Sequence, residues 1–282
     1  MKVVVCIKQV PDTTDIKWTE NNTIQREGVE SIINPFDEYA LETAIRLKDK
    51  YGAEVTAISM GPPQAEDILR KAIAMGCDKA FLVSDRKFSG ADTIATSRTL
   101  ASAIREKAPD TDIIICGQFA TDGDTAQTGP SIAENLNFPQ VTYVKEITNI
   151  EDNFATVKKE VEDGIETLKM KLPGVLCVQK CDYEPRPIKI KGYITAQEAQ
   201  VPYYNIDDIK LDPTLVGIKG SPTYVSKAFR PDQKKECELV TPETATQAAD
   251  YIMQKIEEAK IDLAESYVVC KLKEHHTEES GQ

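Results

Sequence analysis

The chain has 282 residues and a formal net charge of −12, which argues against nonspecific binding to nucleic acid or to an anionic membrane surface. No apolar run approaches the roughly 20 residues that a membrane-spanning helix needs, and seven scattered cysteines, an odd number, favour a reducing compartment over a disulfide framework. We therefore expect a soluble cytoplasmic protein that neither inserts into membranes nor binds nucleic acid.

The first half of the chain alternates between short apolar runs and amphipathic stretches. Such runs predict buried strands, and apolar residues at helical spacing predict helices between them. This alternation implies right-handed crossovers and a parallel sheet covered by helices on both faces. The predicted strands are Lys2–Val10, Glu54–Met60, Lys79–Val83 and Asp112–Cys116. The predicted helices begin at Asn34, Gln64, Asp92 and Pro130 and end near Gly52, Gly76, Lys107 and Leu136.

The second half of the chain has a different pattern. Val141–Ile150, Phe154–Val161 and Ile165–Leu172 alternate with period two and predict an antiparallel meander. Gly174–Gln179 is again apolar throughout, as a buried strand would be.

From Asp182 onward prolines are frequent and periodicity is weak, except at Thr244–Ala259, which predicts an amphipathic helix. So long an irregular stretch is unusual within a compact domain. We therefore expect an α/β core at residues 1–200, with a Rossmann-like parallel sheet and an antiparallel extension, and an irregular C-terminal arm at residues 201–282 that wraps around a partner subunit.

The stretch from Cys116 to Pro130 lies between a predicted strand and a predicted helix. Backbone N–H groups and the positive end of a helix dipole would face an anion there. Its glycines at 117, 123 and 129 match neither G-x-G-x-x-G nor the G-x-x-x-x-G-K-[ST] loop. Asp122 and Asp124 would repel a phosphate, so they must turn away, cap the backbone or bond ligand hydroxyls. A capped surface turn is the alternative.

Ligands of parallel sheets bind at the C-terminal ends of the strands. Four predicted loops, at residues 8–15, 59–63, 84–92 and 116–129, meet at that edge. The two histidines, His275 and His276, lie in a polar tail, so the core offers no histidine as a base or metal ligand. Cys177 and Cys181 are better explained as buried apolar residues than as a metal or dithiol site. We predict no metal site and no catalytic side chain.

Five motifs occur in order along the chain. They are VCIKQVPD at 5–12, INPFDEYA at 33–40, SMGP at 59–62, GADT at 90–93 and DGDTAQTG at 122–129. Together they closely resemble the β (small) subunit of electron-transfer flavoproteins. The resemblance covers essentially the whole chain, most weakly after about residue 200. A nucleotide hydrolase or adenylating enzyme would need a glycine- or serine-rich loop after the first strand, which QVPD at 9–12 does not provide. A scaffold subunit without nucleotide is a further alternative.

The resemblance implies a Rossmann-like core, an α subunit that carries FAD, and a nucleotide in the β subunit. AMP-binding members typically carry a D-D-D loop that ends N-Q-T-G, whereas electron-bifurcating members bind a second FAD there and carry D-G-D-T-A-Q. Asp122–Gln127 has the second form, and Gly123 would permit close approach to a ligand or a positive φ. The expected cofactor is FAD, with AMP as the alternative. NADH is the expected donor, and ferredoxin and a flavin-dependent dehydrogenase of acyl-CoA or lactate type are the expected acceptors, in anaerobic metabolism.

The resemblance assigns cofactor contacts to the same four loops. Asn34 and Asp37 could bond a ribose or flavin edge, or could simply begin a helix. Thr93 and Thr96 could bond the ligand or cap a helix, and Cys6 could pack against adenine or fill the core. The full expected set is Cys6, Asn34, Asp37, Met60, Asp92, Thr93, Thr96, Cys116, Asp122, Gly123, Asp124, Thr125, Ala126, Gln127, Thr128 and Gly129.

Two segments depart from the family pattern. Gln118-Phe119 stands where a basic residue followed by glutamine is usual, which removes a charge that could pair with phosphate or flavin. The segment Glu184–Tyr193 resembles the loop that recognises the dehydrogenase, with Ile190 as its apolar anchor and Tyr193 near it. Gln197–Gln200 replaces the usual basic run after that loop, which favours an unusual dehydrogenase as the partner.

Overall fold

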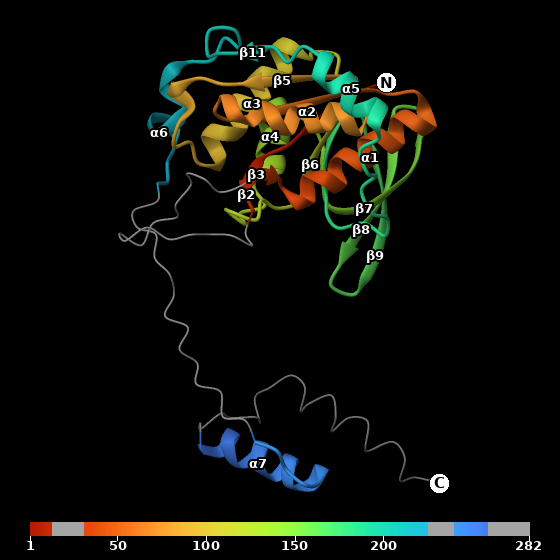
Figure 1. Ribbon diagram of the computed structural model, residues 1–282, viewed down its shortest axis with the longest axis vertical. Coiled ribbons are helices and arrows are strands. Elements are labelled where there is room, and N and C mark those ends of the chain that lie inside the picture. The colour runs from red at the N-terminus through yellow and green to blue at the C-terminus, as the bar shows by residue number, and fades with distance from the viewer. Residues whose placement is uncertain (13–30, 225–239, 259–282) are drawn as a thin grey trace. The chain divides into compact units, whose positions relative to one another are not determined.

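The computed structural model describes residues 1–12, 31–224 and 240–258 (Figure 1). These residues fall into two compact units, one within Met1–Phe229 and the other within Arg230–Gln282. The first unit contains the sheet and its covering helices. The described part of the second unit contains the helix α7 (Ala245–Glu258).

Nine strands of the first unit form one sheet, in the order β11-β5-β4-β1-β6-β10-β7-β8-β9. Neighbouring strands pair in parallel from β11 to β7, and β7, β8 and β9 pair antiparallel. The strands are β1 Lys2–Cys6, β4 Glu54–Met60, β5 Lys79–Val83, β6 Ile113–Gly117, β7 Gln140–Glu151, β8 Phe154–Val161, β9 Gly164–Lys171, β10 Gly174–Val178 and β11 Tyr203–Tyr204. A separate antiparallel pair joins β2 (Gln9–Pro11) to β3 (Ser31–Ile33).

Helices cover both faces of this sheet. On one face α1, α2 and α5 share a core with Val3 and Val5 of β1, and on the other face α3 and α4 share a core with Val4 and Cys6. The alternation of β1 between two apolar cores explains why its buried residues, Val3–Cys6, are all apolar. The helices are α1 Pro35–Tyr51, α2 Glu66–Met75, α3 Thr93–Lys107, α4 Thr128–Leu136, α5 Ile190–Glu198 and α6 Gly217–Gly220, with single 3₁₀ turns at Pro63–Ala65, Arg86–Phe88 and Pro213–Leu215.

The ends of the helices follow from local chemistry. Pro35 occupies the first turn of α1, where its missing N–H costs nothing. Gly52 ends α1 with φ of 68°, and Gly76 ends α2 with φ of 136°, a backbone region in which glycine is not strained. Asp92 caps α3 by accepting hydrogen bonds from the N–H groups of Ile94 and Ala95.

The structure confirms the predicted α/β class, the parallel sheet and the antiparallel meander. Some details differ. The strand predicted at Lys2–Val10 divides into β1 and β2, and the helix predicted from Pro130 begins at Thr128. The stretch predicted to be irregular from Asp182 contains α5 and β11, and β11 pairs with β5 at the edge of the sheet. The compact unit therefore extends beyond residue 200.

Candidate functional site

β1 and β6 lie side by side at the centre of the sheet, and the chain leaves them toward opposite faces. After β1 it reaches α1, and after β6 it reaches α4. In open α/β sheets a crevice forms beyond the carboxyl ends of two such strands, and ligands bind there. Residues 7–12 and 118–127 lie at this point, and residues 61–62 and 84–92 follow β4 and β5 at the same edge (Figure 1).

Asn34 joins the start of α1 to the loop after β6. Its Nδ2 donates to the carbonyl oxygen of Phe119 at 2.6 Å, and its Oδ1 accepts the N–H of Thr121 at 3.1 Å. The side chain makes no capping bond to α1, although its position before Pro35 predicted one. Asn34 is fully buried, so its amide group acts as a clamp on the backbone at residues 119–121.

Asp37 joins the exits of β1 and β6. Its Oδ2 accepts the N–H of Lys8 at 2.7 Å, and its Oδ1 accepts the N–H of Gly117 at 3.1 Å. A Cβ atom at position 117 would overlap Asp37 Oδ1, so glycine is needed for this approach. Burial raises the pKa of Asp37 to about 7, although the hydrogen bonds oppose that rise. Asp37 is therefore a buried clamp that changes its charge near neutral pH.

The loop after β6 closes on itself and on Lys8. Lys8 Nζ donates to Asp122 Oδ1 at 2.6 Å, so this carboxylate already has a cationic partner. The carbonyl oxygen of Ala120 accepts the N–H groups of Gly123 at 3.1 Å and Asp124 at 2.7 Å. These two N–H groups thus form hydrogen bonds within the loop, whereas the sequence predicts that they face an anion.

Gly123 is an exposed position of the loop. Its φ is not positive, whereas Asp124 and Ala126 have φ of 48° and 54°, so the left-handed conformation expected at Gly123 lies instead at these two residues. No atom lies within 4 Å of the place that a Cβ atom of residue 123 would take. The conformation of the loop therefore does not require glycine at this position.

The N-termini of α3 and α4 meet beside this loop. Thr93 Oγ1 donates to Gln127 Oε1 at 3.1 Å. The first N–H groups of a helix lack partners within the helix and carry partial positive charge. For α4 these include the N–H groups of Thr128 and Gly129, since Pro130 has none. Thr125 is exposed and Thr96, one turn into α3, is half-buried. The arrangement provides several donors for an anion.

Asp92, which the family motif assigns to the cofactor, is engaged by the chain itself. Its Oδ1 accepts the N–H groups of Ile94 and Ala95 at 3.0 Å each, and its Oδ2 accepts Thr223 N at 3.1 Å and Thr223 Oγ1 at 2.9 Å. Burial alone would raise the pKa of Asp92, but these bonds outweigh it and hold the pKa below its usual value. Asp92 is an ionised helix cap that also fixes Thr223 at the rim of the site.

Three thiols lie side by side beneath the N-terminus of α4. Cys6, Cys116 and Cys177 occupy matching positions on β1, β6 and β10, and all are buried. A hydrogen bond with Cys6 and burial raise the pKa of Cys116, and burial raises the pKa of Cys177 to about 12. A Cβ atom at position 129 would overlap Cys177 Sγ, so Gly129 lets α4 begin directly above this row. Met60, half-buried, packs against the same core.

The sequence patterns missed an aromatic group beside residue 118. Gln118 is buried and its Oε1 accepts the N–H of Tyr143 at 2.6 Å, so this side chain is bound to β7. The ring of Phe119 packs edge-on against Phe36, with centroids 5.1 Å apart, and against Tyr143, at 6.0 Å. Tyr143 has φ of 57°, which is rare for a large side chain. Only the departure of Gln118-Phe119 from the family motif hinted at this group.

Ile190 and Tyr193 lie on α5 rather than in the expected loop. They are 83% and 58% exposed, and Ile194 next to them is 53% exposed. Large apolar side chains that share an exposed patch mark surfaces that bind other molecules.

Comparison with known proteins decides the family. The model of the electron transfer flavoprotein domain matches residues 21–208. The chain belongs to the electron transfer flavoprotein family. It is 45% identical to the electron transfer flavoprotein subunit beta of Clostridium acetobutylicum, over 92% of this chain and 98% of that protein. It is 44% identical to the caffeyl-CoA reductase-Etf complex subunit CarD of Acetobacterium woodii, over 93% of this chain and all of that protein.

Another relative is the acryloyl-CoA reductase electron transfer subunit gamma of Anaerotignum propionicum, 41% identical over 83% of this chain and 90% of that protein. Such relatives make this chain a β subunit of an electron transfer flavoprotein, a flavin-associated complex that carries electrons. Among the helices at residues 1–12, 31–224 and 240–258, none is long and apolar enough to cross a bilayer. Within the same ranges no cluster of three His, Cys, Asp or Glu side chains could hold a metal ion.

The residues at the crevice fit a nucleotide. Asp122 is neutralised by Lys8, Asp92 is engaged by backbone N–H groups, and the N-terminus of α4 offers donors for a diphosphate. At the end of β4, the buried Ser59 Oγ has no hydrogen-bond partner among the described residues. An unpaired buried hydroxyl costs about 1–3 kcal/mol, so Ser59 Oγ is a candidate hydrogen-bonding group for a ligand at this edge of the sheet.

Proposed function

We propose that this subunit binds FAD in the crevice between β1 and β6, and that its complex with the α subunit bifurcates electrons from NADH. One electron goes to ferredoxin, and the other goes through the FAD of the α subunit to a flavin-dependent dehydrogenase. The loop Asp122–Gln127 at the crevice is the observation that carries the proposal. When bound, FAD would supply hydride acceptance and one-electron release. The protein supplies binding, orientation and charge.

The residues of the crevice divide this work. The N–H groups of Thr128 and Gly129 bind the diphosphate, since a helix N-terminus stabilises an anion by about 0.3–1 kcal/mol in addition to the hydrogen bonds. The linked side chains of Thr93 and Gln127 bond the sugar hydroxyls. The ammonium group of Lys8 forms a salt bridge with Asp122. It thereby offsets the negative charge of a carboxylate that would repel the diphosphate.

Gly123 supports FAD over AMP. Neither φ nor crowding demands glycine at this position, so the reason for glycine lies in what approaches the loop from outside. The AMP-binding pattern places a third carboxylate here, which would add negative charge to a loop that already carries Asp122 and Asp124. A glycine instead adds no charge beside a phosphate and leaves room for a ligand larger than AMP.

The names of the relatives support an acyl-CoA dehydrogenase as the partner. They include subunits of a caffeyl-CoA reductase complex and of an acryloyl-CoA reductase. We propose that Ile190 and Tyr193 of α5 bind this dehydrogenase, that the C-terminal arm with α7 binds the α subunit, and that the complex works in the cytoplasm of an anaerobic cell. The net charge of −12 disfavours docking of an acidic ferredoxin on this chain. Ferredoxin would therefore dock at a local basic patch or on another subunit.

The deciding experiment is cofactor extraction from the chain purified with its α subunit. We expect two FAD and no AMP per heterodimer, followed by ferredoxin reduction that depends on NADH and on the dehydrogenase substrate. One FAD and one AMP would refute bifurcation and leave a carrier of single electrons. No nucleotide in the β subunit would indicate a scaffold.

A further inference from the structure

The helix α5 exposes large apolar residues and buries almost nothing of its own. Ile190 is 83% exposed, Tyr193 58% and Ile194 53%, and within α5 only Ala196 is buried. A helix of nine residues is not stable in isolation. Something outside the apolar core must therefore hold α5 in its conformation.

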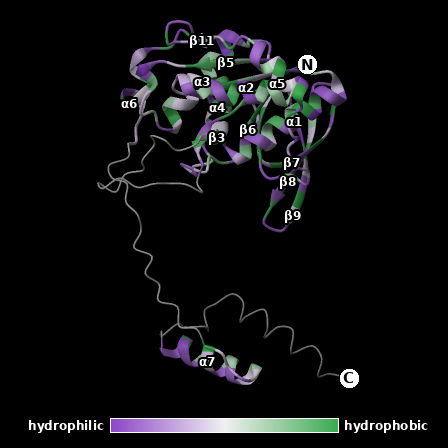
Figure 2. Cartoon of the chain, viewed as in Figure 1, coloured by the Kyte–Doolittle hydropathy of each residue, from purple (hydrophilic) through white to green (hydrophobic). Residues whose placement is uncertain are grey.

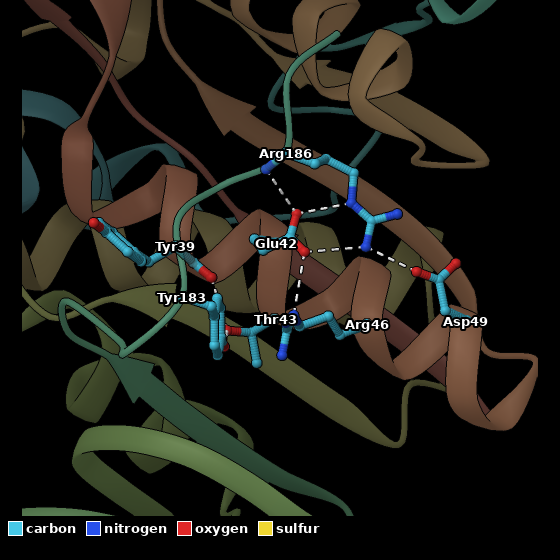
Figure 3. A network of polar contacts seen from close by, with 7 residues as sticks. All are labelled: Tyr39, Glu42, Thr43, Arg46, Asp49, Tyr183 and Arg186. Atoms are coloured by element: carbon cyan, nitrogen blue, oxygen red, sulfur yellow. Dashed lines mark hydrogen bonds and ion pairs between the residues drawn. The ribbon is translucent and has the colours of Figure 1, made fainter. Parts of the chain in front are cut away.

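One anchor lies just before α5, where Arg186 binds Glu42 of α1 (Figure 3). Arg186 Nε donates to Glu42 Oε2 at 2.8 Å, Nη2 donates to Oε1 at 3.0 Å, and the backbone N–H of Arg186 donates to Oε2 at 3.0 Å. Arg186 Nη2 also donates to Asp49 at 2.8 Å. Glu42 is 4% exposed. A buried carboxylate that accepts a guanidinium fork fixes orientation as well as distance.

The contacts around the same segment add to this anchor. Tyr39 OH donates to Glu184 at 2.9 Å, and the hydroxyls of Thr43 and Tyr183 lie 2.7 Å apart. The guanidinium of Arg46 lies 3.9 Å from the centre of the Tyr183 ring. Side chains from three consecutive turns of α1 thus contact residues 183–186. Figure 3 shows Glu42, Thr43 and Arg46 of α1 beside Tyr183 and Arg186.

A second anchor lies at the other end of α5. Arg70 of α2 donates from Nη1 to the carbonyl oxygen of Ala196 at 2.7 Å and to that of Ala199 at 3.3 Å. Carbonyl groups at the C-terminus of a helix have no partner within it, so the cation both satisfies them and complements the dipole. Between the anchors, a Cβ atom at Gly192 would overlap the carbonyl oxygen of Ala74, so α5 lies directly against α2.

We propose that Arg186 and Arg70 are positioning residues that hold α5 as a preformed docking helix for the dehydrogenase, an inference that rests on the proposed function. Preorganisation favours binding because the conformational entropy of α5 is lost in folding rather than in association. The helix that carries Glu42 also carries Asp37 at the crevice. The docking surface and the nucleotide loop are therefore fixed to the same rigid element.

The test uses the intact heterodimer with a purified short-chain acyl-CoA dehydrogenase as electron acceptor. Arg186→Met and Arg70→Met should each raise KM for the dehydrogenase about tenfold, as expected when a preformed surface becomes mobile, with kcat and flavin content unchanged. Lys79→Met, which removes an exposed cation paired with Glu54, is the matched control and should leave KM unchanged. Hydrogen exchange at residues 190–198 should rise in the two arginine variants alone.

Ile190→Ser distinguishes a docking role of α5 from the positioning role of the two arginines. If Ile190→Ser and the wild type have the same KM for the dehydrogenase, α5 is not the docking surface and the proposed partner site is refuted. If Ile190→Ser raises KM but the arginine variants do not, the positioning role alone is refuted. In the Ile190→Ser background, Arg186→Met should add little, because both act through one helix. Should Arg186→Met fail to fold, Arg186→Lys, which keeps the charge but loses the fork, gives the same comparison.

Discussion

A Cβ atom at Gly123 would have no atom within 4 Å, which separates the effect of this residue on folding from its effect on the ligand. We predict that Gly123→Asp changes the free energy of unfolding by less than about 0.5 kcal/mol, as surface changes do. Its affinity for FAD should fall about tenfold, or roughly 1.4 kcal/mol, because a carboxylate is added beside the diphosphate. Flavin and nucleotide content of the purified heterodimer measures this. Gly123→Ala is the uncharged control, and undiminished FAD in Gly123→Asp would contradict the prediction.

Asp37 makes the stability of the fold depend on pH near neutrality. Burial raises its pKa to about 7, whereas an unfolded chain has a value near 3.9. Between these values the folded state binds more protons than the unfolded state, so stability falls as pH rises from about 4 to about 7 and is fully reduced above that range. Both histidines lie in the tail at 275–276, which leaves Asp37 as the main titrating group that the described core offers in this range.

We therefore predict that the wild type loses about 2 kcal/mol of unfolding free energy between pH 5.5 and pH 8. In Asp37→Asn the loss should be much smaller, although the variant is less stable at pH 5.5 because an amide cannot accept both N–H groups of Lys8 and Gly117. Urea unfolding at the two pH values measures the difference. If both proteins lose the same unfolding free energy between pH 5.5 and pH 8, Asp37 does not titrate in that range. Lys8 and Cys116, which interact electrostatically with Asp37, are left in place in the variant.

At the scale of elements, the sequence predicted those parts whose signals are local. Apolar runs located the buried strands, and Gly52 and Gly76 marked where α1 and α2 end. The helix α5 was missed because it has only nine residues and lies in a proline-rich stretch, although Ile190, Tyr193 and Ile194 have the i, i+3, i+4 spacing of one helix face. β11 has only two residues and exists because β5 offers it an edge.

The same distinction applies to the candidate site. The order of strands and loops predicted which segments share an edge, and the family motif identified the loop after β6. The partners of Asn34 and Asp37 were beyond sequence reasoning, because they lie about 80 residues away at Phe119 and Gly117 and depend on the complete sheet. A local pattern indicated a helix start at Asn34, and a tertiary contact overrode it.

Gly129 allows a direct test of how α4 is seated on the sheet. Gly129→Ala should lower the stability of the heterodimer by about 1–3 kcal/mol, the usual cost of overpacking, because its Cβ atom would overlap Cys177 Sγ. Cys177→Ala removes that sulfur, so the same change should cost clearly less in its background. Thermal unfolding of the four proteins measures the coupling. A cost that is equal in both backgrounds would rule out the contact as the cause.

At the scale of the whole molecule, the sheet unit buries its own core, and the described part of the second unit does not. The 14 residues of α7 include no buried side chain, and Ile252 and Met253 are 58% and 48% exposed. Hydrophobic and hydrophilic residues both occur along this helix (Figure 2). A helix this short needs a packing partner for stability, which supports the α subunit as the surface that covers it.

Ile252→Asp tests this assignment. Burying an isoleucine side chain at an interface contributes about 1.5–3 kcal/mol, and a buried aspartate adds a desolvation cost, so the dissociation constant of the heterodimer should rise at least about tenfold. Asp250→Ala changes a polar position of the same helix and should leave that constant unchanged. Sedimentation or titration calorimetry with the purified α subunit measures both. If Ile252→Asp binds the α subunit as tightly as the wild type does, the apolar residues of α7 serve another partner, and the arm does not hold the two flavoprotein subunits together through this helix.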